Sequence, residues 1–189
     1  NSGIISLNDG YFICNLLEDT TELGLDYQFI KLDRAFRIIK ETNFGKSDRT
    51  AIGGSLILLE DSTVLIAMDE YYKQQPGKNI RILKMSSNLD LISEVEVNNN
   101  TVDPIGRYPI IKRSKDSSIF IWHYKTVRLG PGIFPFPITL FKYNSNYQML
   151  FEREFSYYGV EYVTGDMVLT ENQHLYFCGN LFNSEGNLA

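Results

Sequence analysis

The sequence is poor in the residues that most often build catalytic and metal sites. Its 189 residues include two histidines, His123 and His174, and two cysteines, Cys14 and Cys178. Two cysteines are too few for a disulfide scaffold. Both lie in apolar stretches, so we expect small buried side chains. So few histidines leave little material for a metal or acid–base site. We therefore expect no metal and no cofactor.

Excess positive charge and long hydrophobic runs are also missing. The chain has 18 Lys and Arg against 23 Asp and Glu, a net charge of −5. Binders of nucleic acids or anionic membranes normally carry a basic excess. No apolar run approaches the roughly 18–20 residues of a transmembrane helix. We expect neither a nucleic-acid partner nor membrane insertion. The first residue is Asn1 with no apolar leader after it, which indicates a processed or cut chain.

What the sequence does contain is an internal repeat. Gly53–Val97 and Arg107–Phe155 share one order of features: two apolar runs around an Asp turn, a long loop, then two further runs around a polar turn. The first turn recurs at Asp9, Asp61, Asp116 and Asn172, about 52, 55 and 56 residues apart. A lysine in the third run recurs at Lys31, Lys84 and Lys142, about 53 and 58 residues apart. These periods are close to the ~50 residues of a kelch-type propeller blade.

Each repeat unit predicts four strands. In the second unit the first two are expected at Ser55–Glu60 and Thr63–Met68. The second strand of every unit is apolar at each position, as in VLIAM and IFIWHY, which is typical of burial on both faces. The fourth strand alternates, with Glu94 and Glu96 between apolar residues, which indicates a half-exposed strand. A gradient from buried to half-exposed strands favours a β-propeller blade.

The sequence thus predicts an all-β fold, a β-propeller or partial propeller of about three and a half four-stranded antiparallel blades. We expect a single repeat domain over 1–189, with units at about 1–47, 48–100 and 101–157 and a half unit at 158–189. The half unit holds inner strands and needs outer ones. We therefore expect part of a longer propeller, whose ring other chains or missing blades close. An open arc exposes apolar blade faces and strand edges.

One stretch resembles a known group of proteins. YQFIKLDRAFRIIKETNFG followed by GGSLILLEDSTVLIAM is similar to the units of secreted bacterial β-propeller repeat proteins. The resemblance covers essentially the whole chain and implies a propeller fold and an extracellular or cell-surface location. It implies no particular activity, because propellers host many unrelated functions. The Trp-Asp dipeptide of WD40 repeats is missing, and a kelch-like Gly-Gly occurs once, at Gly53-Gly54.

The connections indicate where a ligand would bind. In an up-and-down sheet, the second-to-third connection and the connection to the next sheet emerge at the same end. The sequence makes these long, as at Glu18–Asp26, Asp69–Lys78 and Lys125–Pro137, and keeps the other turns short, as at Asn8–Gly10 and Ser86–Asn88. Long loops on a rigid scaffold usually carry function. The candidate ligand-binding residues at this end are Tyr71, Tyr72, Arg128, Phe134, Phe136, Tyr157 and Tyr158.

Aromatic rings at this end could stack on a sugar or anchor a protein, or they could pack within the loops. Carboxylates are expected there too: Asp69, Glu70, Asp103, Glu161 and Asp166. A glycosidase needs two of them roughly 5–10 Å apart, which a sequence does not reveal, so we predict no catalytic residue. Trp122-His123-Tyr124 resembles a sugar-stacking cluster, but its place on an inner strand favours packing.

The leading interpretation is a non-enzymatic binding or scaffold module for a protein or carbohydrate ligand. One alternative is a propeller-type glycoside hydrolase or lyase fragment, with carboxylates lining the channel mouth. A second alternative is a structural repeat in a surface or filament assembly. The binding module requires exposed aromatic residues at the long-connection end, and the enzyme requires converging acids there. The assembly component requires partners on the blade faces and edges instead.

Overall fold

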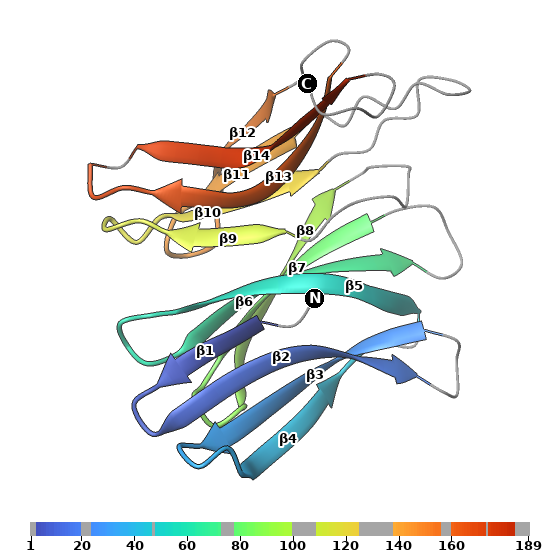
Figure 1. Cartoon of the computed structure of the whole chain (residues 1–189), viewed down its shortest axis with the longest axis vertical. Helices are drawn as coiled ribbons and strands as arrows, with labels where there is room; N and C mark the ends of the chain where they lie inside the picture. The colour runs from blue at the N-terminus through green and yellow to red at the C-terminus, as the bar shows by residue number, and fades with distance from the viewer. Residues whose placement is uncertain are drawn as a thin grey trace. The chain divides into compact units, whose positions relative to one another are not determined.

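The structure is a computed structural model with 14 β-strands and no helix in the segments that it describes (Figure 1). These segments are 3–19, 24–46, 48–72, 78–99, 109–124, 138–155, 160–172 and 174–183. The strands are β1 (Gly3–Leu7), β2 (Gly10–Asp19), β3 (Gly24–Asp33), β4 (Ile38–Phe44), β5 (Arg49–Leu58), β6 (Val64–Tyr72), β7 (Lys78–Met85), β8 (Leu91–Asn99), β9 (Ile110–Arg113), β10 (Ile119–Tyr124), β11 (Ile138–Tyr143), β12 (Met149–Phe155), β13 (Val160–Leu169) and β14 (Leu175–Asn183). No segment in this description is a helix of the length and hydrophobicity that crossing a membrane requires.

The strands form four antiparallel sheets, each made from consecutive strands. Sheet A is β1-β2-β3-β4, sheet B is β5-β6-β7-β8, sheet C is β9-β10-β11-β12, and sheet D is the pair β13-β14. The predicted all-β fold of three four-stranded sheets and a half sheet is confirmed. The chain divides into two compact units, Asn1–Asn100 with sheets A and B and Thr101–Ala189 with sheets C and D.

Several strands are longer than the sequence predicts. β5 begins at Arg49 rather than Ser55, and β6 continues past Met68 to Tyr72. β2 and β3 likewise extend into the predicted connection Glu18–Asp26. Hydrophobicity marked only the apolar part of each strand, which is the second half of β5 and the first half of β6. The ladder is made by backbone groups and therefore continues through polar residues that the pattern assigns to loops.

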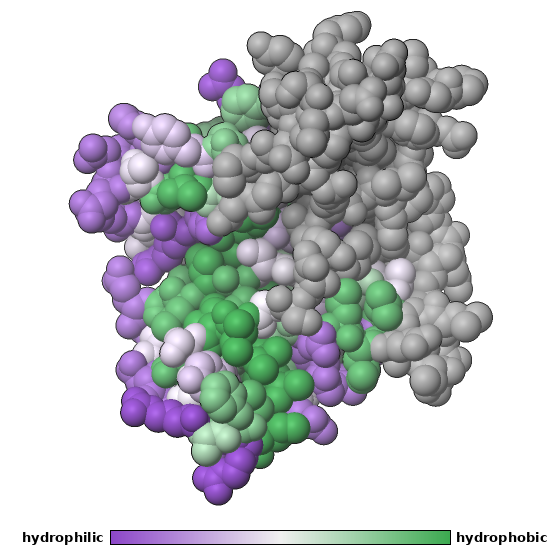
Figure 2. Space-filling view, in the orientation of Figure 1, coloured by the Kyte–Doolittle hydropathy of each residue, from purple (hydrophilic) through white to green (hydrophobic). Residues whose placement is uncertain are grey.

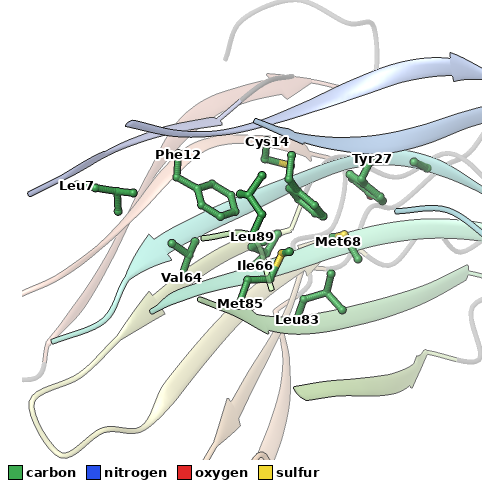
Figure 3. Packing of buried hydrophobic residues seen from close by; sticks show 12 residues of the cluster. Leu7, Phe12, Cys14, Tyr27, Val64, Ile66, Met68, Leu83, Met85 and Leu89 are labelled. Atoms are coloured by element: carbon green, nitrogen blue, oxygen red, sulfur yellow. The ribbon is translucent and has the colours of Figure 1, made fainter. Parts of the chain in front are cut away.

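The core of the first unit lies between sheets A and B (Figure 3). In Figure 3, Phe12, Cys14 and Tyr27 of sheet A face Ile66 and Met68 of sheet B. Strict alternation along β2 and β6 places these side chains on one face of each sheet. The expected burial of Cys14 is confirmed, and it is a free thiol whose pKa is raised to about 12 by desolvation. The side chain of Cys178 lies outside the described residues.

In the second unit, sheets C and D pack through a smaller cluster that includes Phe120, Trp122 and Met167. The Trp122 ring stacks on Phe177 with ring centres 3.8 Å apart. The predicted packing role of Trp122 is confirmed, since its side chain is buried in this cluster. The backbones of His123 and Tyr124 continue β10, but their side chains lie outside the description.

One hairpin turn recurs at the end of the sheets that carries the short connections, which we call the short-turn end. In each copy the fourth residue has a positive φ near 60°; these residues are Phe36, Ser62, Leu89, Ser117 and Tyr147. Its N–H donates to the carbonyl three residues earlier, as from Ser62 to Leu59 at 3.0 Å. The first turn of sheet A is shorter and requires Gly10, because an added Cβ would overlap the carbonyl oxygen of Leu32.

The two sequence markers of the repeat are partners in one interaction. In each four-stranded sheet the third-strand lysine forms an ion pair with the acid of the first turn. Lys31 lies 2.7 Å from Asp9, Lys84 lies 2.8 Å from Asp61, and Lys142 lies 3.9 Å from Asp116. We call these pairs the Asp–Lys clamps. Each one ties the first hairpin of a sheet to its third strand. Sheet D has no third strand in the described residues, and its turn carries Asn172 in place of the acid.

Candidate ligand-binding end

The opposite end of the sheets carries the long connections and is the predicted ligand-binding end. Tyr71 and Tyr72 form the last two positions of β6 there, where their backbones pair with Thr50 and Arg49 of β5. Their side chains are not described. The other candidates, Arg128, Phe134, Phe136, Tyr157 and Tyr158, lie outside the described residues. The structure therefore places the backbone of two candidates at the expected end and leaves the binding role a prediction.

Directly before this tyrosine pair lies a buried ion-pair network. Glu70 is 2% exposed and accepts a hydrogen bond from the Arg81 guanidinium, which is fully buried. Arg49 Nη1 lies 3.5 Å from the other oxygen of Glu70. The Arg81 guanidinium also lies 5.0 Å from the centre of the Phe44 ring of sheet A. Glu70 is thus held between two arginines at the boundary of sheets A and B.

The network continues to the fourth strand of sheet B and to the segment that leads into β5. Arg49 donates to Glu96 through Nη1 at 2.7 Å and Nη2 at 3.3 Å. Lys46 donates to Glu96 at 2.8 Å and to Glu94 at 3.0 Å. Arg81 reaches Glu94 at 3.4 Å. Three cations and three carboxylates therefore join all of β5, β6, β7 and β8 at this end. We call these six residues, Lys46, Arg49, Glu70, Arg81, Glu94 and Glu96, the six-residue network.

Burial and ion pairing act in opposite directions on these carboxylates. Desolvation raises the pKa of Glu70, although Arg81 and Arg49 favour its ionised form. For Glu96, the hydrogen bond from Arg49 outweighs burial and lowers the pKa to about 2. The pKa of Lys46 is raised, chiefly by its hydrogen bond to Glu96. Within one network, the innermost acid is therefore the one most easily protonated.

A second set of hydrogen bonds fixes the same part of sheet B from sheet A. The Tyr27 hydroxyl lies 2.8 Å from the carbonyl oxygen of Gly53 and 2.7 Å from that of Asp69, and these two oxygens share its single proton. Gly53 follows a β-bulge in β5, where the register shifts after Ala51. A bulge leaves backbone groups out of the ladder. The buried Tyr27 hydroxyl supplies a donor at that point and holds the ends of β5 and β6 against sheet A.

The predicted carboxylates at this end fall into two groups. Asp69 and Glu70 are described, and their exposed fractions are 0% and 2%. Both side chains are therefore buried, and the Glu70 carboxylate is already bonded to Arg81 and Arg49. Asp103 lies outside the description, and Glu161 and Asp166 are described only in their backbones, on β13. Among the described residues, no group of three or more acids, histidines or cysteines is arranged to hold a metal ion.

Sequence reasoning placed Asp69 and Glu70 at the long-connection end but missed their role and their partners. Arg81 and Arg49 were not singled out at all. A usable signal was present: the second strand of the first unit has Leu16-Leu17 where the second unit has Asp69-Glu70, and Arg81 interrupts the apolar run of β7. Charges of opposite sign in two adjacent buried strands indicate a buried pair.

Comparisons with known proteins identify the fold. No family model matches the chain, and no curated protein matches it. A Bacteroides caccae protein of unknown function is similar in structure, with a TM-score of 0.51 at 13% identity over 94% of this chain and 60% of that one. A mutant of Cellvibrio cellulosa alpha-L-arabinanase, a five-bladed propeller, is similar with a TM-score of 0.52 at 9% identity, over 97% of this chain and 68% of that one.

At these identities the likeness shows the fold alone. The chain is a β-propeller or partial propeller built from four-stranded antiparallel sheets. It spans about 60% of the length of the Bacteroides protein that it resembles. The sheets can therefore be called blades.

Proposed function

We propose that this chain is a binding module that holds a carbohydrate ligand over the long-connection end of its blades, with Tyr71 and Tyr72 as the contact residues of the second blade. The observation that carries the proposal is the six-residue network directly before this pair. It joins the four strands of sheet B at the end where the tyrosine backbones lie. Binding sites are most effective when their residues stand on a rigid support.

The state of the described acids also supports a binding role over catalysis. Glu70 and Asp69 are enclosed at this end, and Glu70 is engaged by Arg81 and Arg49. The Glu70 carboxylate thus joins β6 to β5 and β7. A sugar is the ligand class we test first because the flat face of a tyrosine ring can stack on it while the hydroxyl hydrogen-bonds. The propeller neighbour that is an arabinanase makes arabinan oligosaccharides the first probe.

The test is titration calorimetry of the whole chain with arabinan oligosaccharides, and then with a panel of plant and bacterial glycans. Tyr72→Ala should weaken binding about 5- to 10-fold, because it removes one aromatic contact that contributes about 1 kcal/mol to the binding free energy. Tyr147→Asn is the matched control, because it removes a tyrosine from the short-turn end, where Asn tolerates the positive φ. Equal affinity in the wild type and Tyr72→Ala, or no binding to any glycan, would overturn the proposal.

A glycoside hydrolase is the second candidate, favoured by the arabinanase neighbour and by the two acids on β13. The same oligosaccharides distinguish it. A hydrolase releases new reducing ends, and Asp166→Asn or Glu161→Gln abolishes that release. A binding module retains the oligosaccharides intact after prolonged incubation.

A further inference from the structure

The free face of sheet A is built from the same positions as a face of sheet B whose central residues are fully buried. The Asp–Lys clamps fix the correspondence: Lys31 pairs in the ladder with Phe12, and Lys84 pairs with Leu65. Phe12 therefore corresponds to Leu65. Their neighbours along the strand, Tyr11 and Ile13 in sheet A, correspond to Val64 and Ile66 in sheet B. Val64 and Ile66 are fully buried against sheet A.

The two faces differ in exposure rather than in kind. Ile4 of sheet A corresponds to Leu56, which packs against the core between the sheets, yet Ile4 is 61% exposed. The positive-φ residue of the third-to-fourth turn shows the same contrast. Leu89 is 4% exposed within that core, whereas Phe36 is 64% exposed and stacks on Tyr11. Figure 2 shows hydrophobic side chains reaching the surface of the first unit.

The repeat therefore indicates which kind of surface fits the free face of sheet A. In the chain itself, a face of this type is covered by the opposite face of a preceding blade, whose central residues are Phe12, Cys14 and Phe29. A second surface of that covering type is exposed on sheet D. Counted from the first turn of each sheet, Tyr176 of sheet D occupies the same position as Phe12 of sheet A. Leu65 of sheet B and Phe120 of sheet C occupy this position too.

Sheet D presents its two faces unequally. Phe177 and Met167 point toward sheet C and pack there. The next pair in the ladder, Tyr176 and its cross-strand partner Val168, lies on the other face, and these side chains are 58% and 51% exposed. In the first unit the corresponding position, Phe12, is fully buried, because sheet B covers it.

We propose that this polypeptide associates head to tail with a second copy of itself, with the Ile4, Tyr11, Ile13 and Phe36 face of sheet A seated on the Val168 and Tyr176 face of sheet D of the other copy. The contact reproduces between chains the blade-to-blade packing seen between sheets A and B. The two patches differ, so the association is heterologous: each copy offers one face of each kind. Exposed apolar faces rimmed by polar residues often mark protein–protein interaction sites.

Two variants separate this association from non-specific aggregation. Ile4→Lys with Phe36→Asn blocks the sheet A face, and Asn suits the positive φ of position 36. Val168→Glu with Tyr176→Lys blocks the sheet D face with an opposite-charge cross-strand pair. Met149→Lys is the matched control, because Met149 is similarly exposed but lies on the outer strand β12. Circular dichroism verifies that each variant retains its sheets.

The measurement is sedimentation velocity over a range of protein concentrations. We expect the wild type and Met149→Lys to associate at micromolar concentration, and each blocked variant to self-associate at least about tenfold more weakly. A mixture of the two blocked variants should recover a one-to-one pair, because each still has one intact and complementary face. A monomeric wild type, unchanged association of the blocked variants, or a mixture that stays monomeric would each overturn the proposal.

Discussion

The two ends of sheet B carry ion pairs of similar chemistry in opposite surroundings. At the short-turn end, Lys84 and Asp61 meet at 2.8 Å with half of the Asp61 side chain exposed. At the long-connection end, Arg81 and Glu70 meet in nearly complete burial. The same type of pair recurs in all three four-stranded blades with an exposed acid, although the lysine of sheet A, Lys31, is buried. The buried pair has no counterpart in sheet A, where the corresponding residues are Gln28 and Leu17.

The difference indicates which ion pairs can recur in every unit of a repeat at little energetic cost. An exposed clamp contributes little and costs little, because water solvates either partner if the other is lost. A buried pair commits both partners, because either one alone is left charged without water. The short-turn end therefore carries the interactions that all three four-stranded blades share. The long-connection end is the part in which this blade departs from its neighbours.

The largest expected effect comes from breaking the buried pair. Arg81→Met leaves the Glu70 carboxylate buried with only the longer Arg49 contact, and we expect a loss of about 3–5 kcal/mol in unfolding free energy. Urea denaturation measures it. The double variant Arg81→Met with Glu70→Leu should recover most of the loss, because it removes both charges. A single variant as stable as the wild type would mean that Glu70 is solvated by water after all.

The dependence of stability on pH should differ in sign between the two ends. The folded-state pKa of Glu70 lies above its ordinary value of 4.5, so the contribution of Glu70 to stability falls as the pH rises through the window above 4.5. The pKa of Asp61 falls from 3.8 to about 2, chiefly through its hydrogen bond from Lys84. Its contribution is therefore present above pH 3.8 and is lost as the pH falls toward 2.

Thermal unfolding from pH 2 to pH 8 tests both signs. Glu70→Gln should flatten the decline above pH 4.5, and Asp61→Asn should flatten the loss on the acid side. The Asp61 effect should be about 0.5 kcal/mol, because solvent screens a half-exposed pair. Identical pH profiles for the two variants would contradict the contrast between the ends.

The smallest effect is expected from a single clamp. Lys84→Met should lower the unfolding free energy by about 0.5 kcal/mol, the ordinary contribution of an exposed ion pair. Asn172→Asp is the matched control in sheet D, where no third strand and no third-strand lysine are described, and it should change stability by about 0.2 kcal/mol or less. A loss of more than about 2 kcal/mol in unfolding free energy for Lys84→Met would show that the Asp–Lys clamps are major contributors to stability.

Much of the fold was predictable because its signals are local and repeated. The apolar second strands, the alternating fourth strands and the turn residues recur about every 52–58 residues, and they predicted four-stranded antiparallel sheets that the structure confirms. The marker residues Asp61 and Lys84 were found as a pattern, and their contact explains why both recur. β5 and β6 were predicted too short, because the backbone hydrogen-bond ladder continues through polar residues beyond the apolar run.

The candidate site was less predictable, because its contacts join distant positions. The sequence by itself determined that the strands pair in order and that the long connections share one end, since hairpin turns and a period of two act over a few residues. Only the tertiary structure decided that Glu70 lies buried between Arg81 and Arg49, and that Phe36 is exposed where Leu89 is covered. Those outcomes depend on which sheet packs on which face, and residues alike in sequence pattern differ in burial only after that packing.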